Sequence, residues 1–179
     1  MKKLLLLLLL LPLVVFSQTS TSNVTLNVRL YPIQTIIVNP LQSTVNLDYT
    51  TATNYNNGVT TLQPNHLSVY STGGFVVSVK SQDATLTNTI NSDFINSSDI
   101  KILASEGSAN SLAGVSYSSE VSLSTTAQPI FSIATGGVNK NFNITYTAKG
   151  DLNTYINKYY NSQNPTVYST TVIYEITPV

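Results

Sequence analysis

The sequence predicts an all-β protein, an antiparallel β-sandwich of about seven to nine strands with at most one short helix near 152–160. Three observations favour this fold class. Apolar residues recur at every second position along most of the chain, which is typical of half-buried strands. Turn-forming pairs such as Asn57-Gly58 and Gly73-Gly74 separate the alternating runs, and Ser, Thr and Asn fill the connections. Alternation and turn spacing do not distinguish a sandwich from a barrel, so a barrel stays an alternative.

The first seventeen residues predict a signal peptide rather than a part of the fold. Two lysines precede the apolar run Leu4–Phe16, and Val15 and Ser17 are small enough for the −3 and −1 positions of a signal peptidase site. The run is shorter than the ~20 apolar residues that a membrane span needs. We therefore expect cleavage after Ser17, a single domain over 18–179, and no membrane span. Such a protein is secreted, to a periplasm, the cell surface or an extracellular filament.

Almost at the start of the mature chain comes "SNVTLNVRLYPIQTIIV", residues 22–38. Four apolar residues alternate with polar ones in its first half: Val24, Leu26, Val28 and Leu30. Pro32 then interrupts, because proline lacks the N–H that a central ladder needs. We expect the denser second half, Ile33–Val38, to belong to the core of its own molecule. The first half is either the first strand of its own sheet or a strand exchanged with a neighbouring molecule.

Further alternating runs predict the remaining strands. They lie at 45–49, 67–79, 100–102, 121–123, 130–133, 142–146 and 166–179. In the last run we expect an inner face that contains Val167, Val172, Tyr174 and Ile176, with a bulge near Ser169 and Thr170. Residues 50–65 are polar and predict a connection with a tight turn at Asn57-Gly58.

One segment, 151–160, has a different period. Leu152, Tyr155, Ile156 and Tyr159 are spaced as on one face of a helix, and Asp151 is a suitable N-cap. We expect one short helix or helical turn here. The alternative is a loop that packs three tyrosines onto the edge of the domain.

A short internal echo relates two parts of the chain. "LSVYSTGG" at 67–74 is similar to "IFSIATGG" at 130–137, and an alternating strand follows each copy. Glycine pairs at strand ends are common where a chain turns between sheets. We therefore expect two equivalent turns between the sheets of a sandwich.

The charge balance argues against nucleic acid as a partner. Without residues 1–17 the chain has six basic and eight acidic residues, and they are scattered rather than gathered in a basic patch. Cysteine is absent, so the core alone must stabilise the fold.

The residues needed for catalysis or metal binding are scarce. The single histidine, His66, follows Pro64 at a predicted strand start, where a surface or turn position is expected. One histidine without cysteine argues against a zinc site. Asp93 and Asp99 flank "FINSS", but turn-capping and solvated-loop roles fit them better than a catalytic pair. We expect no enzyme activity, no catalytic or metal site and no cofactor.

Tyrosine is the enriched aromatic residue, with eleven copies and no tryptophan. Four tyrosines cluster in the sequence near the C-terminus: Tyr155, Tyr159, Tyr160 and Tyr168. Exposed tyrosines stack on sugars or on partner proteins, so these four are a candidate binding patch. The alternative is that they are ordinary half-exposed tyrosines of a β-sheet.

"VTLNVRLYPIQTIIV", "VNLDY", "NHLSVYSTGGFVVSVKS" and the terminal "VIYEITPV" resemble segments of small bacterial surface proteins, the pilin-like and spore-coat-U-like domains. The signal peptide ending "FSQ" looks like those of Bacteroidetes. The resemblance implies an immunoglobulin-like sandwich and a structural role as a fimbrial or filament subunit. It implies strand addition through Val24–Leu30, with a second copy or another surface subunit as the partner. An adhesin-like module that binds glycans or proteins is the alternative.

Overall fold

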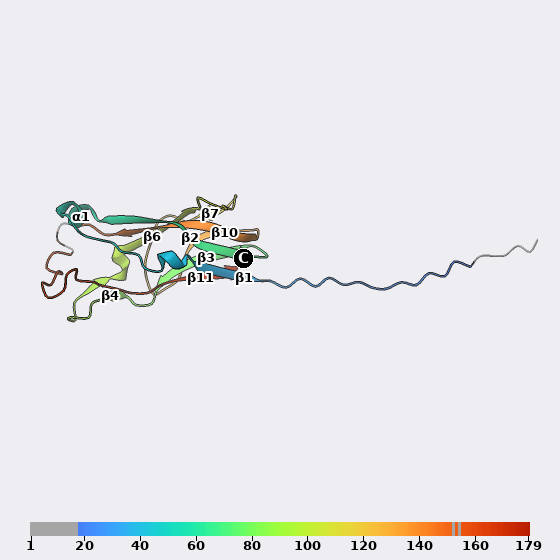
Figure 1. Ribbon diagram of the computed structural model, residues 1–179, viewed down its shortest axis with the longest axis horizontal. Coiled ribbons are helices and arrows are strands. Elements are labelled where there is room, and N and C mark those ends of the chain that lie inside the picture. The colour runs from blue at the N-terminus through green and yellow to red at the C-terminus, as the bar shows by residue number, and fades with distance from the viewer. Residues whose placement is uncertain (1–17, 152, 154) are drawn as a thin grey trace, which may run out of the picture. The chain divides into compact units, whose positions relative to one another are not determined.

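The protein is described by a computed structural model (Figure 1). The described residues are 18–151, 153 and 155–179. The chain divides into two parts, Met1–Leu30 and Tyr31–Val179. Within the first part the structure describes residues 18–30, which we name the N-terminal arm. The predicted signal peptide, 1–17, lies outside the described residues.

Two antiparallel sheets form the second part, so the predicted sandwich is confirmed. One sheet has the strand order β1 (Gln34–Val38), β2 (Val59–Ser71), β10 (Gly137–Ala148), β6 (Ile100–Glu106) and β8 (Val121–Ser122). The other has the order β11 (Val172–Pro178), β3 (Phe75–Ser81), β9 (Gln128–Ile133) and β7 (Ser116–Tyr117). A separate pair joins β4 (Thr85–Thr87) to β5 (Phe94–Asn96). The strands outnumber the sequence prediction because several contain only two or three residues.

The core lies between the two sheets. Phe75, Phe131 and Phe142 are at most 1% exposed. The rings of Phe131 on β9 and Phe142 on β10 stack with their centroids 4.1 Å apart. Because these strands belong to different sheets, the stacked pair holds the sheets face to face.

Two equivalent turns carry the chain between the sheets, as the internal echo predicted. The turn at Thr72–Gly74 leads from β2 to β3, and the turn at Thr135–Gly137 leads from β9 back to β10. The turns pack against each other, because a Cβ at Gly136 would collide with the backbone oxygen of Ser71. Glycine is therefore required at Gly136 by close approach of two backbones.

A bulge in β2 changes which side chains face the core. β2 uses five residues, Gln63–Leu67, where its partner β10 uses three, Phe142–Ile144. Asn65 takes a left-handed conformation at φ 49°, and its N–H donates to Oδ1 of Asn143 over 2.7 Å. The extra residues turn His66 inward together with its neighbour Leu67.

The structure has a short α-helix, α1 (Ala52–Asn57), and places it in the stretch predicted as a polar connection. Thr51 and Asn54 form a capping box at its start. Gly58, with φ 86°, ends the helix just before β2, at the predicted turn. Two 3₁₀ turns are also described, η2 (Pro40–Gln42) and η3 (Ser97–Asp99).

The segment predicted as a helix near 152–160 forms turns and bends in its described residues. Leu152 and Thr154 lie outside the described residues. Asn157 has φ 69°, a left-handed conformation that interrupts any helix through this point. The only α-helix of the described residues is therefore α1.

Two predicted strand regions lie along the core without full pairing. Val45, Leu47 and Tyr49 pack against the core on alternate positions, but 45–50 belongs to no strand. The last predicted run is a strand only over β11, whose Val172, Tyr174 and Ile176 contact the core. Before β11, Ser169 makes an isolated bridge to Thr87. Val167 is 51% exposed, so its predicted place on the inner face is wrong.

Candidate functional site

The N-terminal arm carries the alternating residues predicted as a strand, yet none of its residues lies in one. Its four apolar side chains are almost fully exposed: Val24 92%, Leu26 86%, Val28 78% and Leu30 90%. The first strand of the sandwich is β1, which begins at Gln34. Whether Val24–Leu30 pairs within its own sheet or with a neighbour stays open. Exchange with a neighbour stays a prediction.

The ladder between β1 and β2 ends where β2 turns away. Gln34 pairs with Ser71, and Thr72 then donates its N–H to the carbonyl of Ile33 over 3.0 Å. The Ile33 N–H donates to Oγ1 of Thr72 over 2.9 Å. Beyond this point the chain enters the turn to β3, so β2 offers no partner to Pro32 and the residues before it.

β1 has one buried face and one exposed face. Ile36 and Val38 pack against the core, whereas Ile33 and Ile37 are 54% and 58% exposed. The prediction that Ile33–Val38 belongs to its own core is thus confirmed for the inner face only.

The exposed apolar surface of the described residues is concentrated near the N-terminus. Of seventeen exposed large apolar side chains, eight lie between positions 24 and 41: Val24, Leu26, Val28, Leu30, Tyr31, Ile33, Ile37 and Leu41. Exposed apolar residues that recur along one stretch of sequence make it a candidate for interaction.

The predicted tyrosine patch is only partly exposed. Tyr155 is 8% exposed, and its ring packs edge-on against Tyr49 with the centroids 5.1 Å apart. Burial raises the pKa of its hydroxyl. Tyr159 is 49% exposed, while Tyr160 and Tyr168 are half-buried. The four residues therefore do not form one exposed platform.

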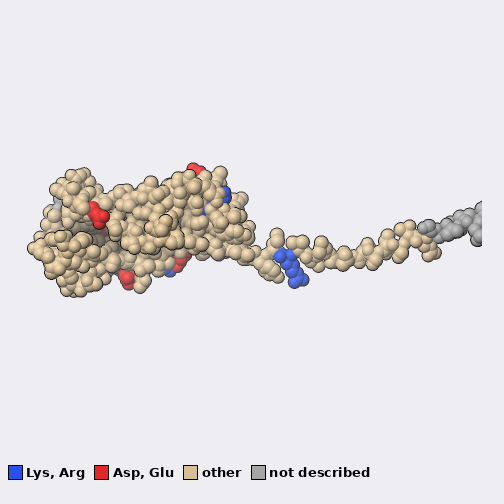
Figure 2. Space-filling model, in the orientation of Figure 1, with Lys and Arg blue, Asp and Glu red and all other residues tan. Residues whose placement is uncertain are grey.

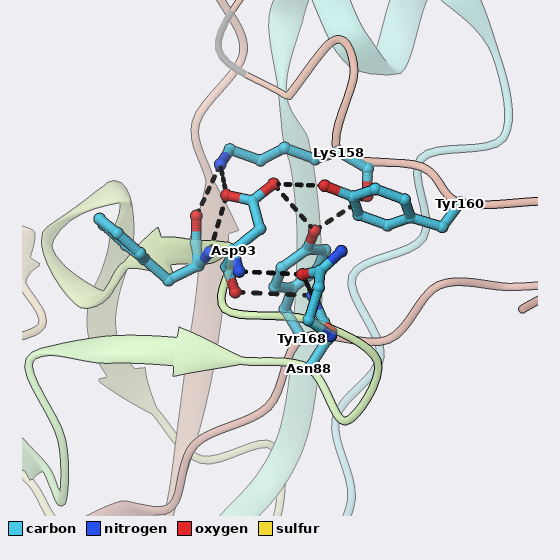
Figure 3. Close-up of polar contacts among 7 residues, drawn as sticks. Asn88, Asp93, Lys158, Tyr160 and Tyr168 are labelled. Carbon is cyan, nitrogen blue, oxygen red and sulfur yellow. Dashed lines mark hydrogen bonds and ion pairs between the residues drawn. The ribbon is translucent and has the colours of Figure 1, made fainter.

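Tyr160 and Tyr168 instead converge on the carboxylate of Asp93 (Figure 3). Their hydroxyls lie 3.0 and 3.4 Å from Oδ2, and Nζ of Lys158 lies 2.7 Å from Oδ1. The same ammonium donates to the carbonyl of Phe94 over 2.7 Å and lies 5.7 Å from the centre of its ring. The Lys158 ammonium, chief among these contacts, lowers the pKa of the Asp93 carboxyl.

This Asp93 cluster joins two connections that are distant in sequence. Asn88 stabilises the turn before Asp93 by accepting from the N–H groups of Ile90 and Asn91 over 2.8 and 3.0 Å. Tyr168 also donates to the carbonyl of Lys158 over 3.0 Å. Because partners within the chain occupy both oxygens of Asp93, the cluster acts as a structural clasp between the 88–94 turn and the 158–168 segment.

His66 is 2% exposed, so its predicted surface position is wrong. Its Nδ1 lies 2.9 Å from Oε1 of Gln42, and its Nε2 lies 2.9 Å from the hydroxyl of Tyr146. The Tyr146 hydroxyl is 2.6 Å from that of Tyr174, on the other sheet. Gln42 Oε1 can only accept, so Nδ1 carries the proton and Nε2 accepts from Tyr146.

The His66 chain of hydrogen bonds therefore connects the two sheets through the core. Burial lowers the pKa of His66 and raises the pKa of Tyr146 to about 12, so all members are neutral at pH 7. Alternation alone could not reveal this role, because the bulge at Asn65 sets the direction of the side chain.

Charged side chains are sparse on the face drawn in Figure 2. Among the described residues, no group of three or more His, Cys, Asp and Glu side chains lies close enough to hold a metal ion. In the same part of the chain, no helix is sufficiently long and apolar to cross a membrane.

Comparison with family models and with curated proteins gives no match. No family model matches the chain, and no curated protein matches it. The resemblance to pilin-like and spore-coat-U-like domains therefore stays a prediction.

Proposed function

We propose that this protein is a secreted, non-enzymatic structural subunit of a surface filament or envelope assembly, and that its N-terminal arm is a strand donated to a neighbouring molecule. The observation that carries the proposal is the exposure of Val24, Leu26, Val28 and Leu30 on alternate positions of an extended segment. Strand addition requires this pattern, because backbone hydrogen bonds give affinity and alternate side chains give specificity.

The energetics favour burial of the arm in an assembly. Burying an aliphatic side chain of this size contributes about 1.5–3 kcal/mol, so the four together contribute on the order of 6–12 kcal/mol. Ordering the arm and losing the freedom of the separate molecules offsets part of this gain. The hydrogen bonds of the added backbone ladder contribute to the contact as well.

The test is an assembly experiment on the purified chain without residues 1–17. A double substitution on the apolar face of the arm, Leu26→Asp with Val28→Asp, places two charges where the added strand must be buried. We expect filaments in electron micrographs of the unaltered chain and their loss in this variant, with sedimentation as a quantitative measure.

The matched control places the same two charges on the polar face of the arm, as Thr25→Asp with Asn27→Asp. This variant should assemble, because its new carboxylates replace polar side chains and leave the apolar face of the arm intact. Thermal melting should give the same midpoint for both variants as monomers. The proposal is falsified if the unaltered chain remains monomeric, or if both pairs of substitutions affect assembly equally.

A second candidate function is a carbohydrate- or protein-binding module. The exposed side chains of Phe94, Ile156 and Tyr159, each between 47% and 49% exposed, favour it near the Asp93 cluster. A glycan array probed with the unaltered chain and with Tyr159→Ala tests this alternative. Binding that is lost in Tyr159→Ala supports it, and an array without binders removes it.

A further inference from the structure

We infer that the arm of one molecule adds to the free edge of β1 in a second copy of the same chain. This inference rests on the proposed function and names the partner surface. Among the described residues β1 pairs with β2 alone, so no strand of its sheet lies along its other edge.

The other free edges of the two sheets are poor acceptors. β7 and β8 contain two residues each, too few to pair with the seven residues Val24–Leu30. β11 is long enough, but it carries Glu175, ion-paired with Lys80 of β3, and it ends in Pro178. Charges and prolines on edge strands are the devices by which proteins prevent strand addition.

The β1 edge lacks these devices. Its residues Gln34–Val38 are uncharged and mostly β-branched, and no charged residue occurs between Arg29 and Asp48. Ile33 and Ile37 stand on its outer face and are more than half exposed. An uncharged, exposed and apolar edge is the kind that recruits another strand.

The arm has the chemistry that this edge requires. Its apolar side chains would lie beside Ile33 and Ile37 and cover them, since apolar cross-strand neighbours stabilise a sheet. The occupant is a second copy, because the arm supplies four uncovered apolar side chains on the same chain that carries the uncovered edge. Donor and acceptor are different surfaces, so the contact is heterologous and can repeat along a filament.

One test replaces an apolar residue of the acceptor edge by lysine. Ile37→Lys should raise the critical concentration for assembly at least tenfold, because a charge would replace the apolar side chain beside which the arm's apolar residues are to lie. The matched control is Leu62→Lys on β2, which alters a side chain of the same sheet with a similar exposure, 55% against 58%. Equal loss of assembly in two variants that melt like the unaltered chain overturns the inference.

A second test uses the absence of cysteine in the chain. Val28→Cys in the arm is mixed with Thr35→Cys on β1, or with Thr177→Cys on β11, and a short bismaleimide links nearby thiols. We expect a covalent dimer from the first mixture and little from the second. A dimer that forms with Thr177→Cys, equally with both, or with neither while filaments are present overturns the assignment to β1.

These outcomes separate the inference from the proposed function. Filaments that depend on the arm, together with cross-linking and Ile37→Lys results that do not involve β1, would show that β1 is not the acceptor. The proposal that the arm is donated would then remain supported. If the unaltered chain forms no assembly, the proposed function fails, and the acceptor fails with it.

Discussion

The N-terminal arm and β1 are separated by three residues and have similar aliphatic character, yet their environments differ completely. Val28 in the arm is 78% exposed, whereas Ile36 in β1 packs against the core. The difference lies in the partner: β1 has β2 beside it, and β2 ends at Ser71 before it can pair with earlier residues. Alternation thus predicts an extended segment with one apolar face, but a neighbouring strand decides whether that face is buried.

Truncating one apolar side chain in the core and one in the arm tests most directly whether burial differs between the two regions. Phe142→Ala in the core should lower the free energy of unfolding by about 3–5 kcal/mol, because it removes a fully buried ring and leaves a cavity. Leu26→Ala in the arm should change the stability of the monomer by less than about 0.5 kcal/mol, since the side chain is exposed. Urea denaturation at low protein concentration measures both.

A loss of more than about 1 kcal/mol in monomeric Leu26→Ala would contradict the comparison, because an exposed side chain has no contacts to lose. Such a loss would indicate that Val24–Leu30 pairs within the sheet of its own molecule.

Acid should lower the free energy of unfolding of the sandwich because His66 is protonated more readily in the unfolded chain. Its pKa is lowered in the fold by burial, so the imidazole is neutral when folded and becomes charged on unfolding below about pH 6.5. Stability is therefore complete above the unfolded pKa and falls as the pH drops from about 6.5 towards the folded pKa. The slope approaches roughly 1.4 kcal/mol per pH unit in this window.

Urea denaturation between pH 7.5 and 5 measures this slope, and nuclear magnetic resonance of the single histidine gives its pKa. His66→Gln should remove the slope, whereas deletion of the arm should leave it unchanged, because the arm has no acidic residue and no histidine. An unaltered slope in His66→Gln would contradict the prediction.

The Asp93 cluster should have the smallest effect. The Asp93 side chain is 27% exposed, so Asp93→Asn should lower the free energy of unfolding by no more than about 1 kcal/mol. The folded pKa of Asp93 lies below the unfolded value of about 3.9, so its contribution is present above that value and is lost as the pH falls towards the folded pKa.

Acid denaturation of Asp93→Asn and of Asp151→Asn provides the measurement and its control. Asp151 pairs with Lys149 over 3.7 Å at a side chain that is 61% exposed, so its substitution should have almost no effect. If both variants behave alike below pH 4, the clasp contributes nothing and Asp93 is an ordinary surface carboxylate.

Some features of the candidate sites could be predicted from the local sequence pattern, whereas others depend on tertiary contacts. The glycine pairs were predictable, because a turn between sheets needs close backbone approach wherever the sheets lie. His66 was not, because the bulge opposite Asn143 reverses the direction expected from alternation. Tyr155 and Tyr160 looked equivalent in sequence, but one entered the core and the other met Asp93, a residue 67 positions away.

By itself, the sequence determined the all-β class, most strand positions and the turns between the sheets, since these follow from side-chain period and from local backbone preferences. Only the tertiary structure decided that two sheets form a sandwich, that His66 is buried, and that Val24–Leu30 lies outside every strand of the described residues. Those features depend on which segments of the chain come together. A segment with a strand's alternating pattern forms no hydrogen-bonded ladder unless the edge of another strand lies beside it.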